Sequence, residues 1–298
     1  MDIIAAMTRY LRELDQPVIT DYDFCMAVFN FHQKKKYRNE KIDISGQFPL
    51  YDEVINGIVT PLIDRGIIAQ HRDFPQGRVF QIIGNQYLEA GDITCTVDPF
   101  AYVSHLSAMA YHGLTNRLPK MLFISTPPSK DWKQFASQKM KKDCKGYLKD
   151  YLNSQLPKLI NINFAKVQKT QITRYSSIHL GAFKNVQGRN LRVATIGRTF
   201  LDMLRKPDYC GGMRHVMDVF ISFAPQYKRL IIDDIDHHGN KIEKARAGYL
   251  LEEHCQIRDE KINEWAKVAQ RGGSRKLDPE RPYAETYSER WCLSLNVD

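Results

Sequence analysis

The strongest constraint on the fold lies between residues 51 and 83, where a helical pattern runs directly into a hairpin pattern. In residues 51–66 apolar side chains recur three or four positions apart, so one face of a helix must be buried. Gly66 follows as the expected end of that helix. Two runs rich in β-formers, Ile67–Arg72 and Arg78–Ile83, are separated by a turn with Pro75 and Gly77. A helix that feeds such a hairpin is typical of a winged helix.

Two further helices are expected before this segment. Ile3–Leu14 has the helical apolar spacing, and a second helix capped by Thr20 or Asp21 extends through Phe31. The polar residues 33–47 are interpreted as an inserted basic loop with a short strand at residues 41–45. Pro61 lies inside the third helix and is expected to kink it, because it lacks an N–H.

The length of 298 residues suits two domains, and 43% hydrophobic residues can form real cores. We predict an α+β protein, with an N-terminal winged helix-turn-helix domain at residues 1–88 and a larger mixed α/β domain at residues 89–298. The second domain should begin with a helix from Asp98 to Gly113, followed by strands at 121–125, 164–174, 177–180 and 191–195. Later segments are mainly helical, and a final strand is expected at residues 291–297. No apolar run reaches the length of about 18 residues that a membrane span needs.

The net charge of +9 is unevenly distributed along the chain. Residues 1–88 carry −1, residues 89–116 carry −3, residues 117–192 carry +13, and residues 193–298 are neutral. The basic segment 117–192 is therefore a candidate for contact with a polyanion or an acidic partner. The alternative is an ordinary solvated lysine-rich helix face.

No catalytic or metal-binding motif is recognised in the sequence. Phosphate-binding glycine loops, HExxH and GxSxG are missing, and the six cysteines are scattered singly, which favours a reducing cytoplasm over disulfides or zinc. Asp233–His238 offers possible ligands, but a polar helix start is the preferred interpretation. Cys210, His105 and His112 are interpreted as packing residues. Arg198 and Asp202, four positions apart, can pair on one helix face. We therefore predict no enzymatic activity, no cofactor and no metal.

Two segments carry a resemblance to a known family. Residues 102–115, YVSHLSAMAYHGLT, and residues 198–212, RTFLDMLRKPDYCGG, resemble two segments of AbiEi-type antitoxins from bacterial abortive-infection, type IV toxin–antitoxin systems. The order, with a winged helix first, also fits, and the resemblance covers most of residues 1–223. It implies an antitoxin that represses its own operon by binding an inverted-repeat operator in double-stranded DNA, where a dimer would match the symmetry. It further implies a nucleotidyltransferase-like toxin as functional partner, opposed without a stable complex. The near-neutral winged helix and the inserted loop depart from the family pattern.

We expect DNA contacts from the third helix, the hairpin and the inserted loop. The candidates are Tyr51, Asn56, Thr60 and Arg65 on the helix, Arg72 and Arg78 at the hairpin, and Lys34, Lys35, Lys36 and Arg38 in the loop. A second basic surface is expected from Lys133, Lys139, Lys141, Lys142, Lys145 and Lys149. The expected protein is cytoplasmic and DNA-associated. The main alternative is a winged-helix-targeted nuclease or another nucleic-acid-acting effector.

Overall fold

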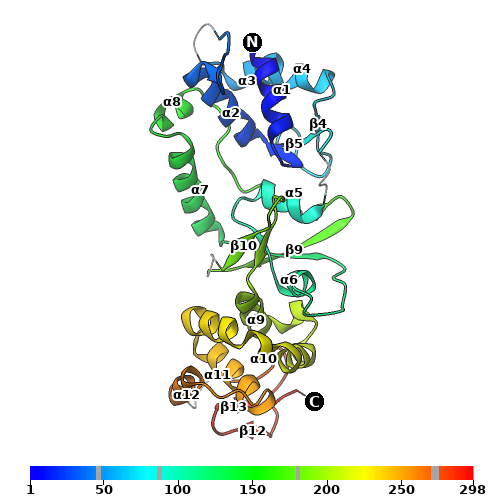
Figure 1. Ribbon diagram of the computed structural model, residues 1–298, viewed down its shortest axis with the longest axis vertical. Helices are drawn as coiled ribbons and strands as arrows, with labels where there is room; N and C mark the ends of the chain where they lie inside the picture. The colour runs from blue at the N-terminus through cyan, green and yellow to red at the C-terminus, as the bar shows by residue number, and fades with distance from the viewer. Residues whose placement is uncertain (45–47, 86–88, 179–181, 270–274, 298) are drawn as a thin grey trace. The chain divides into compact units, whose positions relative to one another are not determined.

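A computed structural model describes residues 1–44, 48–85, 89–178, 182–269 and 275–297 (Figure 1). Helices and short strands are mixed along the chain, which confirms the α+β class in its coarse form. The chain forms two compact units: the first contains Met1–Ala101, Thr126–Ile172 and Asn185–Leu191, and the second contains Tyr102–Ser125, Thr173–Lys184 and Arg192–Asp298. Each unit contains several separated segments of the chain, so the units do not correspond to a single cut in the sequence. The expected domain boundary near residue 89 therefore stays a prediction.

The first unit begins with helices and a three-stranded antiparallel sheet of order β1-β5-β4. In chain order the elements are α1 (Ile3–Glu13), β1 (Val18–Thr20), α2 (Asp21–Lys34), β2 (Lys36–Tyr37), β3 (Glu40–Lys41), α3 (Tyr51–Val54), the π-helical segment η1 (Ile55–Val59), α4 (Thr60–Asp64), β4 (Ile68–Gln70) and β5 (Val79–Ile82). The three predicted helices and the hairpin are therefore confirmed.

Local capping explains where these helices begin and end. The Asp2 carboxylate accepts a hydrogen bond from the Ala5 N–H at 2.7 Å, and Thr20 Oγ1 accepts one from the Asp23 N–H at 3.1 Å. Gly66 ends the third helix in the left-handed conformation, with φ at +65°. Caps of this kind involve residues only three or four positions apart, so the helix boundaries that they set can be recognised in the sequence.

The distortion expected near Pro61 takes the form of a π-helical turn. The Thr60 N–H donates to the Ile55 carbonyl, five residues back, just before the proline. This wider turn changes the hydrogen-bond register where Pro61 cannot donate, so the helical path continues to Asp64.

The inserted segment differs from its prediction. Lys36–Tyr37 pairs with Glu40–Lys41 in a short antiparallel hairpin, so the second strand ends at Lys41 instead of extending from 41 to 45. Residues 42–44 are not strand, and Ser45 lies outside the described residues. Contacts with α1 hold this hairpin, because Tyr37 and Arg38 both bind the Glu13 carboxylate. That contact joins two separate segments, and no local pattern indicates it.

Later segments complete the first unit with α5 (Ala90–Val97), α7 (Ser129–Asp143), α8 (Leu148–Asn153) and β8 (Lys166–Val167), which pairs with the start of β9 (Thr170–Ser176). The helix expected from Asp98 was wrong in its start: α5 ends just before that residue, and the next helix begins at His105. Helix α7 was not predicted.

The core of the first unit joins α2 to α7 and α8. The buried rings of Tyr22 and Phe29 contact Tyr151, with centroids 6.1 and 5.2 Å apart. The Tyr22 hydroxyl donates to Asp143 at 2.9 Å. Aromatic side chains bury about 150–250 Å² each, so these contacts are a major part of the core. Helices α7 and α8 therefore complete the hydrophobic core that residues 1–88 begin.

The second unit combines a mixed sheet with a mainly helical C-terminal part. Its strands follow the order β10-β11-β6-β7-β9, and β6 pairs antiparallel with β7 and parallel with β11. Its elements are β6 (Tyr102–Val103), α6 (His105–Tyr111), β7 (Leu122–Thr126), β10 (Phe183–Asn185), β11 (Arg192–Ala194), α9 (Ile196–Arg205), the 3-10 turn η2 (Pro207–Cys210), α10 (Met213–His238), α11 (Lys241–Tyr249), the π-helical segment η3 (Leu250–His254), α12 (Glu260–Lys267), β12 (Tyr287–Ser288) and β13 (Leu293–Ser294).

Two expectations about the C-terminal part were wrong. Asp233–His238 forms the last turns of α10 instead of a helix start, because α10 continues past Pro225 through a kink at Tyr227. The strand expected at residues 291–297 is reduced to Leu293–Ser294, since Cys292 adopts a left-handed φ of +52°. In this segment Trp291 and Leu293 are buried, whereas Leu295 and Val297 are only partly buried. Residues 177 and 178 are not strand, and Leu180 lies outside the described residues.

Within the described ranges, every helix is too short or too polar to cross a membrane.

Candidate functional site

The exposed positions of the third helical region, α3 through α4, are mostly polar but include Ile63 and the anionic Asp64. Its exposed positions include Asn56, Gly57 and Thr60, whereas Val54, Ile58, Val59 and Leu62 are buried. Three of the four predicted contact residues, Asn56, Thr60 and Arg65, are therefore accessible. Tyr51 is partly buried, and burial raises the pKa of its hydroxyl to about 12.

The acidic residues at the start of this region have a local structural role. The Glu53 carboxylate accepts a hydrogen bond from the Leu50 N–H at 2.8 Å, which caps the first turn. Asp52 lies in the same turn, where the helix dipole favours negative charge. These carboxylates stabilise the helix N-terminus, so they leave the exposed face from Asn56 to Arg65 available for a ligand.

The two hairpin arginines differ in their surroundings. Arg78 Nη1 donates to the Asp21 carboxylate at 2.6 Å, and that carboxylate is only 2% exposed. Burial raises the pKa of the Asp21 carboxyl, and the Arg78 contact opposes that shift. Arg72 is exposed and, within the described residues, makes no ion pair. Arg72 is therefore the hairpin cation that is free to bind a phosphate.

The basic loop residues also separate into two groups. Lys34, Lys35 and Lys36 are exposed, and Lys35 ends α2 with a left-handed φ of +49°. Arg38 is exposed but pairs with Glu13 at 2.8 Å. Within the described residues, the ammonium groups of Lys34, Lys35 and Lys36 are therefore exposed and form no ion pair.

The second basic surface belongs to the same compact unit as these residues. Segments 126–172 and 185–191 carry 11 Lys/Arg and three Asp/Glu, a net charge of +8. Lys139 pairs with Asp143 at 2.8 Å along α7. The exposed members are Lys133, Lys141, Lys142, Lys145 and Lys149. In the first unit, lysines on α7, α8 and the loop between them therefore add positive charge to the near-neutral residues 1–88.

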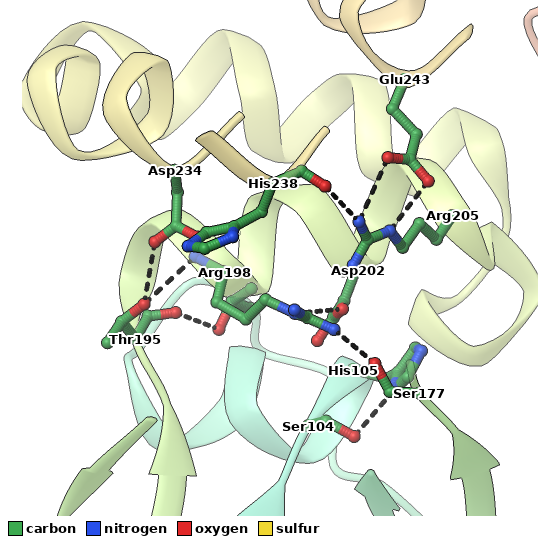
Figure 2. A network of polar contacts seen from close by, with 11 residues as sticks. Ser104, His105, Ser177, Thr195, Arg198, Asp202, Arg205, Asp234, His238 and Glu243 are labelled. Carbon is green, nitrogen blue, oxygen red and sulfur yellow. Dashed lines mark hydrogen bonds and ion pairs between the residues drawn. The ribbon is translucent and has the colours of Figure 1, made fainter. Parts of the chain in front are cut away.

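A buried ion pair lies at the centre of the second unit (Figure 2). Arg198 Nε donates to Asp202 Oδ1 at 2.8 Å, and the two side chains are 1% and 0% exposed. Arg198 Nη2 donates to Ser177 Oγ at 2.9 Å. The predicted pairing is therefore confirmed, and its complete burial is a further finding. A pair without water must have matched geometry to offset its desolvation.

Polar contacts continue from this pair to the neighbouring helices (Figure 2). Thr195 caps α9 by accepting from the Arg198 N–H at 3.2 Å, and its hydroxyl donates to Asp234 on α10 at 3.2 Å. Arg205 Nε donates to Glu243 on α11 at 2.8 Å, and both side chains are 6% exposed. The two ends of α9 are thus joined to α10 and α11.

His105 lies beside this network, in an aromatic surrounding. Its ring is 4.9 Å from that of Tyr175 and 5.5 Å from that of Tyr209, measured between centroids. Its Nδ1 is 2.8 Å from Ser104 Oγ, while its Nε2 has no hydrogen-bond partner among the residues that the structure describes. Burial lowers the pKa of His105 to about 4, so the ring is neutral at pH 7. His105 also adopts a left-handed φ of +49°, which is rare for a residue with a Cβ.

The neighbourhood of Ser104, His105 and Asp202 contains the residue types of a hydrolytic triad but lacks access. All three side chains are 0% exposed, so a substrate has no route to the serine hydroxyl. Cys210 is fully buried, and burial raises the pKa of its thiol well above its ordinary value. Within the described residues, no group of three or more His, Cys, Asp or Glu side chains is arranged to hold a metal ion. The packing interpretation of His105 and Cys210 agrees with this burial.

A cavity of about 560 Å³ lies beside α7 and was not anticipated from the sequence. Its walls come from three separated segments; of its two lysines, Lys133 was assigned to a general basic surface and Lys158 was not singled out. The charge excess of residues 117–192 was the signal that pointed to this region.

No family model and no curated protein matches the chain. Among solved structures, the chain is similar to the RV2827C protein from Mycobacterium tuberculosis, at 12% identity and a TM-score of 0.47. That similarity covers 97% of this chain and 89% of the other.

Proposed function

We propose that the protein is a DNA-binding transcriptional repressor and an AbiEi-type antitoxin, with residues 1–88 as a winged helix. The element order of helix, strand, helix, helix and hairpin supports this assignment, together with the β1-β5-β4 sheet order. In this arrangement α3 through α4 enters the major groove and the β4–β5 hairpin contacts the adjacent backbone. The observation that carries the proposal is the exposed face from Asn56 to Arg65 next in sequence to a hairpin with a free Arg72.

The basic α7 region supports the same proposal. A module with a net charge near −1 attracts DNA weakly, because phosphate neutralisation supplies much of the affinity. Exposed Lys141, Lys142, Lys145 and Lys149 belong to the compact unit that also contains the winged-helix elements. They extend the phosphate-binding surface beyond the residues that read the bases.

The antitoxin assignment rests on the resemblance of two distant segments, and their contact in the second unit supports it. Residues 102–115 contribute the buried His105, and residues 198–212 contribute the buried Asp202 and the half-buried Tyr209, whose ring contacts that of His105. The functional partner is then a nucleotidyltransferase-like toxin, which the protein opposes without a stable complex. A pair of copies on an inverted-repeat operator matches the expected symmetry of such a site.

The test is a gel-shift titration of the full-length protein on DNA from upstream of its own gene. Replacing one phosphate-binding cation reduces the slope of log affinity against log salt by about 0.9 and weakens binding. We expect this for Arg72→Ala and Lys142→Ala, with thermal stability unchanged. Arg229→Ala, which removes an exposed cation of the second unit, is the matched control.

Two results decide against the proposal. If Arg72→Ala, Arg65→Ala and Asn56→Ala all bind operator DNA like the wild type at every salt concentration, the winged-helix interface is wrong. If purified protein cleaves DNA or RNA in Mg²⁺ or Mn²⁺, the alternative of a DNA-targeted nuclease replaces the repressor. Point variants are preferable to truncation at residue 88, since truncation removes Tyr151 from the core around Tyr22.

A further inference from the structure

The cavity beside α7 has the size and lining of a ligand site. Its volume of about 560 Å³ lies within the range of about 300–1,000 Å³ that is typical of small-molecule pockets. Helix α7, helix α8 and the segment 158–161 form its walls, all within the first unit. The lining consists of Ser129, Trp132, Lys133, Ala136, Ser137, Met140, Leu148, Leu152, Lys158, Leu159, Ile160 and Asn161.

The lining combines apolar and polar side chains. On α7 the residues Ser129, Lys133, Ala136 and Met140 follow one another along a single helix face. Eleven residues separate the first from the last, a length of about 16 Å. The serine and lysine lie at the start of this face and Met140 lies at its other end, and α8 adds Leu148 and Leu152 to the lining. An amphipathic molecule fits this mixed lining.

The charged groups of the lining all have one sign. Lys133 and Lys158 contribute ammonium groups, and no carboxylate side chain lines the cavity. Neither lysine forms an ion pair or a side-chain hydrogen bond within the described part of the chain. An anionic headgroup would be the complementary partner for both.

The cavity wall is fixed in place before any ligand arrives. Trp132 is 2% exposed, and its indole Nε1 donates to Asp98 Oδ1 at 3.0 Å. The other Asp98 oxygen accepts from Thr126 Oγ1 at 2.8 Å. At the rim, Leu152 and Ile160 remain 39% and 41% exposed. A rigid wall with an uncovered apolar rim lowers the entropy cost of binding.

We propose that this cavity binds an amphipathic organic anion, with its acidic headgroup between Lys133 and Lys158 and its apolar body along Ala136, Met140 and Leu152. The source of the anion can be an acyl chain or an aromatic acid, which share this chemistry. The proposal is independent of DNA binding, since it uses only the contacts of the cavity itself.

The experiment uses full-length protein and 1-anilinonaphthalene-8-sulfonate, whose fluorescence increases in an apolar site. Saturable binding at one site per chain is expected. The neutral analogue N-phenyl-1-naphthylamine should bind about ten-fold more weakly, because it lacks the charge-assisted hydrogen bonds. Dodecanoate or 1-naphthoate should displace the probe, and which of the two succeeds identifies an acyl or an aromatic ligand. Dodecan-1-ol should not compete.

Paired variants localise the binding. Lys133→Ala combined with Lys158→Ala should weaken sulfonate binding about ten-fold or more, while Lys142→Ala on the same helix changes it less than about two-fold. Ser137→Trp fills the cavity from an exposed position and should abolish binding, whereas Gln138→Trp, which does not line the cavity, should not. The proposal is overturned if binding is not saturable, if neither acid displaces the probe, or if the neutral probe binds with equal affinity. It is also overturned if the two tryptophan variants bind the probe equally at matched melting temperature.

Discussion

A set of exposed charges in the first unit and a set of buried charges in the second show two different uses of charge. In the first unit the lysines of α7 and the arginine at the hairpin project into solvent, where a ligand can reach them. In the second unit Arg198 and Asp202 are enclosed, and Arg205 and Glu243 are nearly so. Exposed charges cost little in stability and serve binding, whereas buried charges must be paired because water cannot solvate them. The location of an ion therefore indicates whether it acts on partners or on the fold.

The largest expected effect comes from breaking the buried pair. Arg198→Ala leaves the Asp202 carboxylate buried without its cation, so the free energy of unfolding should fall by about 3–5 kcal/mol. Arg229 and Asp233 form an i,i+4 pair of the same residue types, at 93% and 61% exposure. Arg229→Ala should leave stability nearly unchanged. Urea unfolding at pH 7 measures both, and equal losses would contradict the comparison.

The double variant Arg198→Met/Asp202→Leu sharpens the same test. Removing both charges eliminates the unpaired buried ion, so most of the stability lost in Arg198→Ala should return. If the double variant is as unstable as Arg198→Ala, side-chain packing and not charge determines the stability of this site.

The next effect concerns pH and His105. Since burial lowers its pKa to about 4, the folded protein holds a neutral ring while the unfolded chain takes up a proton below about 6.5. Stability should therefore fall by about 3 kcal/mol as the pH decreases from about 6.5 to about 4. His105→Asn, a residue that tolerates positive φ, should flatten this part of the profile. Thermal unfolding across this pH range measures the change in stability, and the exposed His237→Asn variant is the control. Identical stability profiles for the wild type and His105→Asn would be inconsistent with a neutral buried ring.

Glycine substitutions test packing instead of charge. A Cβ on Gly248 would lie 2.0 Å from Trp291 Cη2, whereas a Cβ on Gly57 would have no neighbour within 4 Å. Gly248→Ala should destabilise the protein by about 1–3 kcal/mol through overpacking. Gly57→Ala should stabilise it by about 1 kcal/mol, since alanine is the better helix former. Melting temperatures of the two variants must therefore move in opposite directions, and a shared direction would refute this difference in packing.

The smallest effect separates the two hairpin arginines. Arg78→Ala leaves the nearly buried Asp21 carboxylate without its partner, so a loss of about 1–2 kcal/mol is expected at pH 7. Burial raises the pKa of the Asp21 carboxyl, so the loss should shrink as the pH falls from 7 to 4 and the carboxyl takes up protons. Arg72→Ala should not change stability at either pH. Chemical denaturation at both pH values decides this, and a loss that grows on acidification would contradict the assigned ion pair.

The predictable part of the fold was local. Helices with dense apolar periodicity and recognisable caps, such as α1 and α9, agree with the sequence analysis. Helix α7 was missed because only Trp132, Ala136 and Met140 are buried among many lysines and glutamines. The start of α6 was misplaced because the strained backbone of His105 depends on its buried surroundings.

The predictable part of the site was likewise limited to neighbours in sequence. The spacing of Arg198 and Asp202 indicated a pair, but its burial depends on Ser177 and on the packing of α10 and α11 against α9. The Arg78 contact with Asp21 spans 57 residues, so a hairpin cation that looked free in the sequence is partly neutralised. The cavity depends on segments that meet only after folding.

The contact of Tyr22 with Asp143 also has a consequence for the newly made chain. The two residues are 121 positions apart, so at about 5–20 residues per second roughly 6–24 s of translation pass between them. During that interval the aromatic face of α2 remains open to water, chaperones or another nascent chain. The first helices to be synthesised are therefore among the last to complete their packing. Slower translation between residues 34 and 143 would prolong the exposure of their apolar side chains.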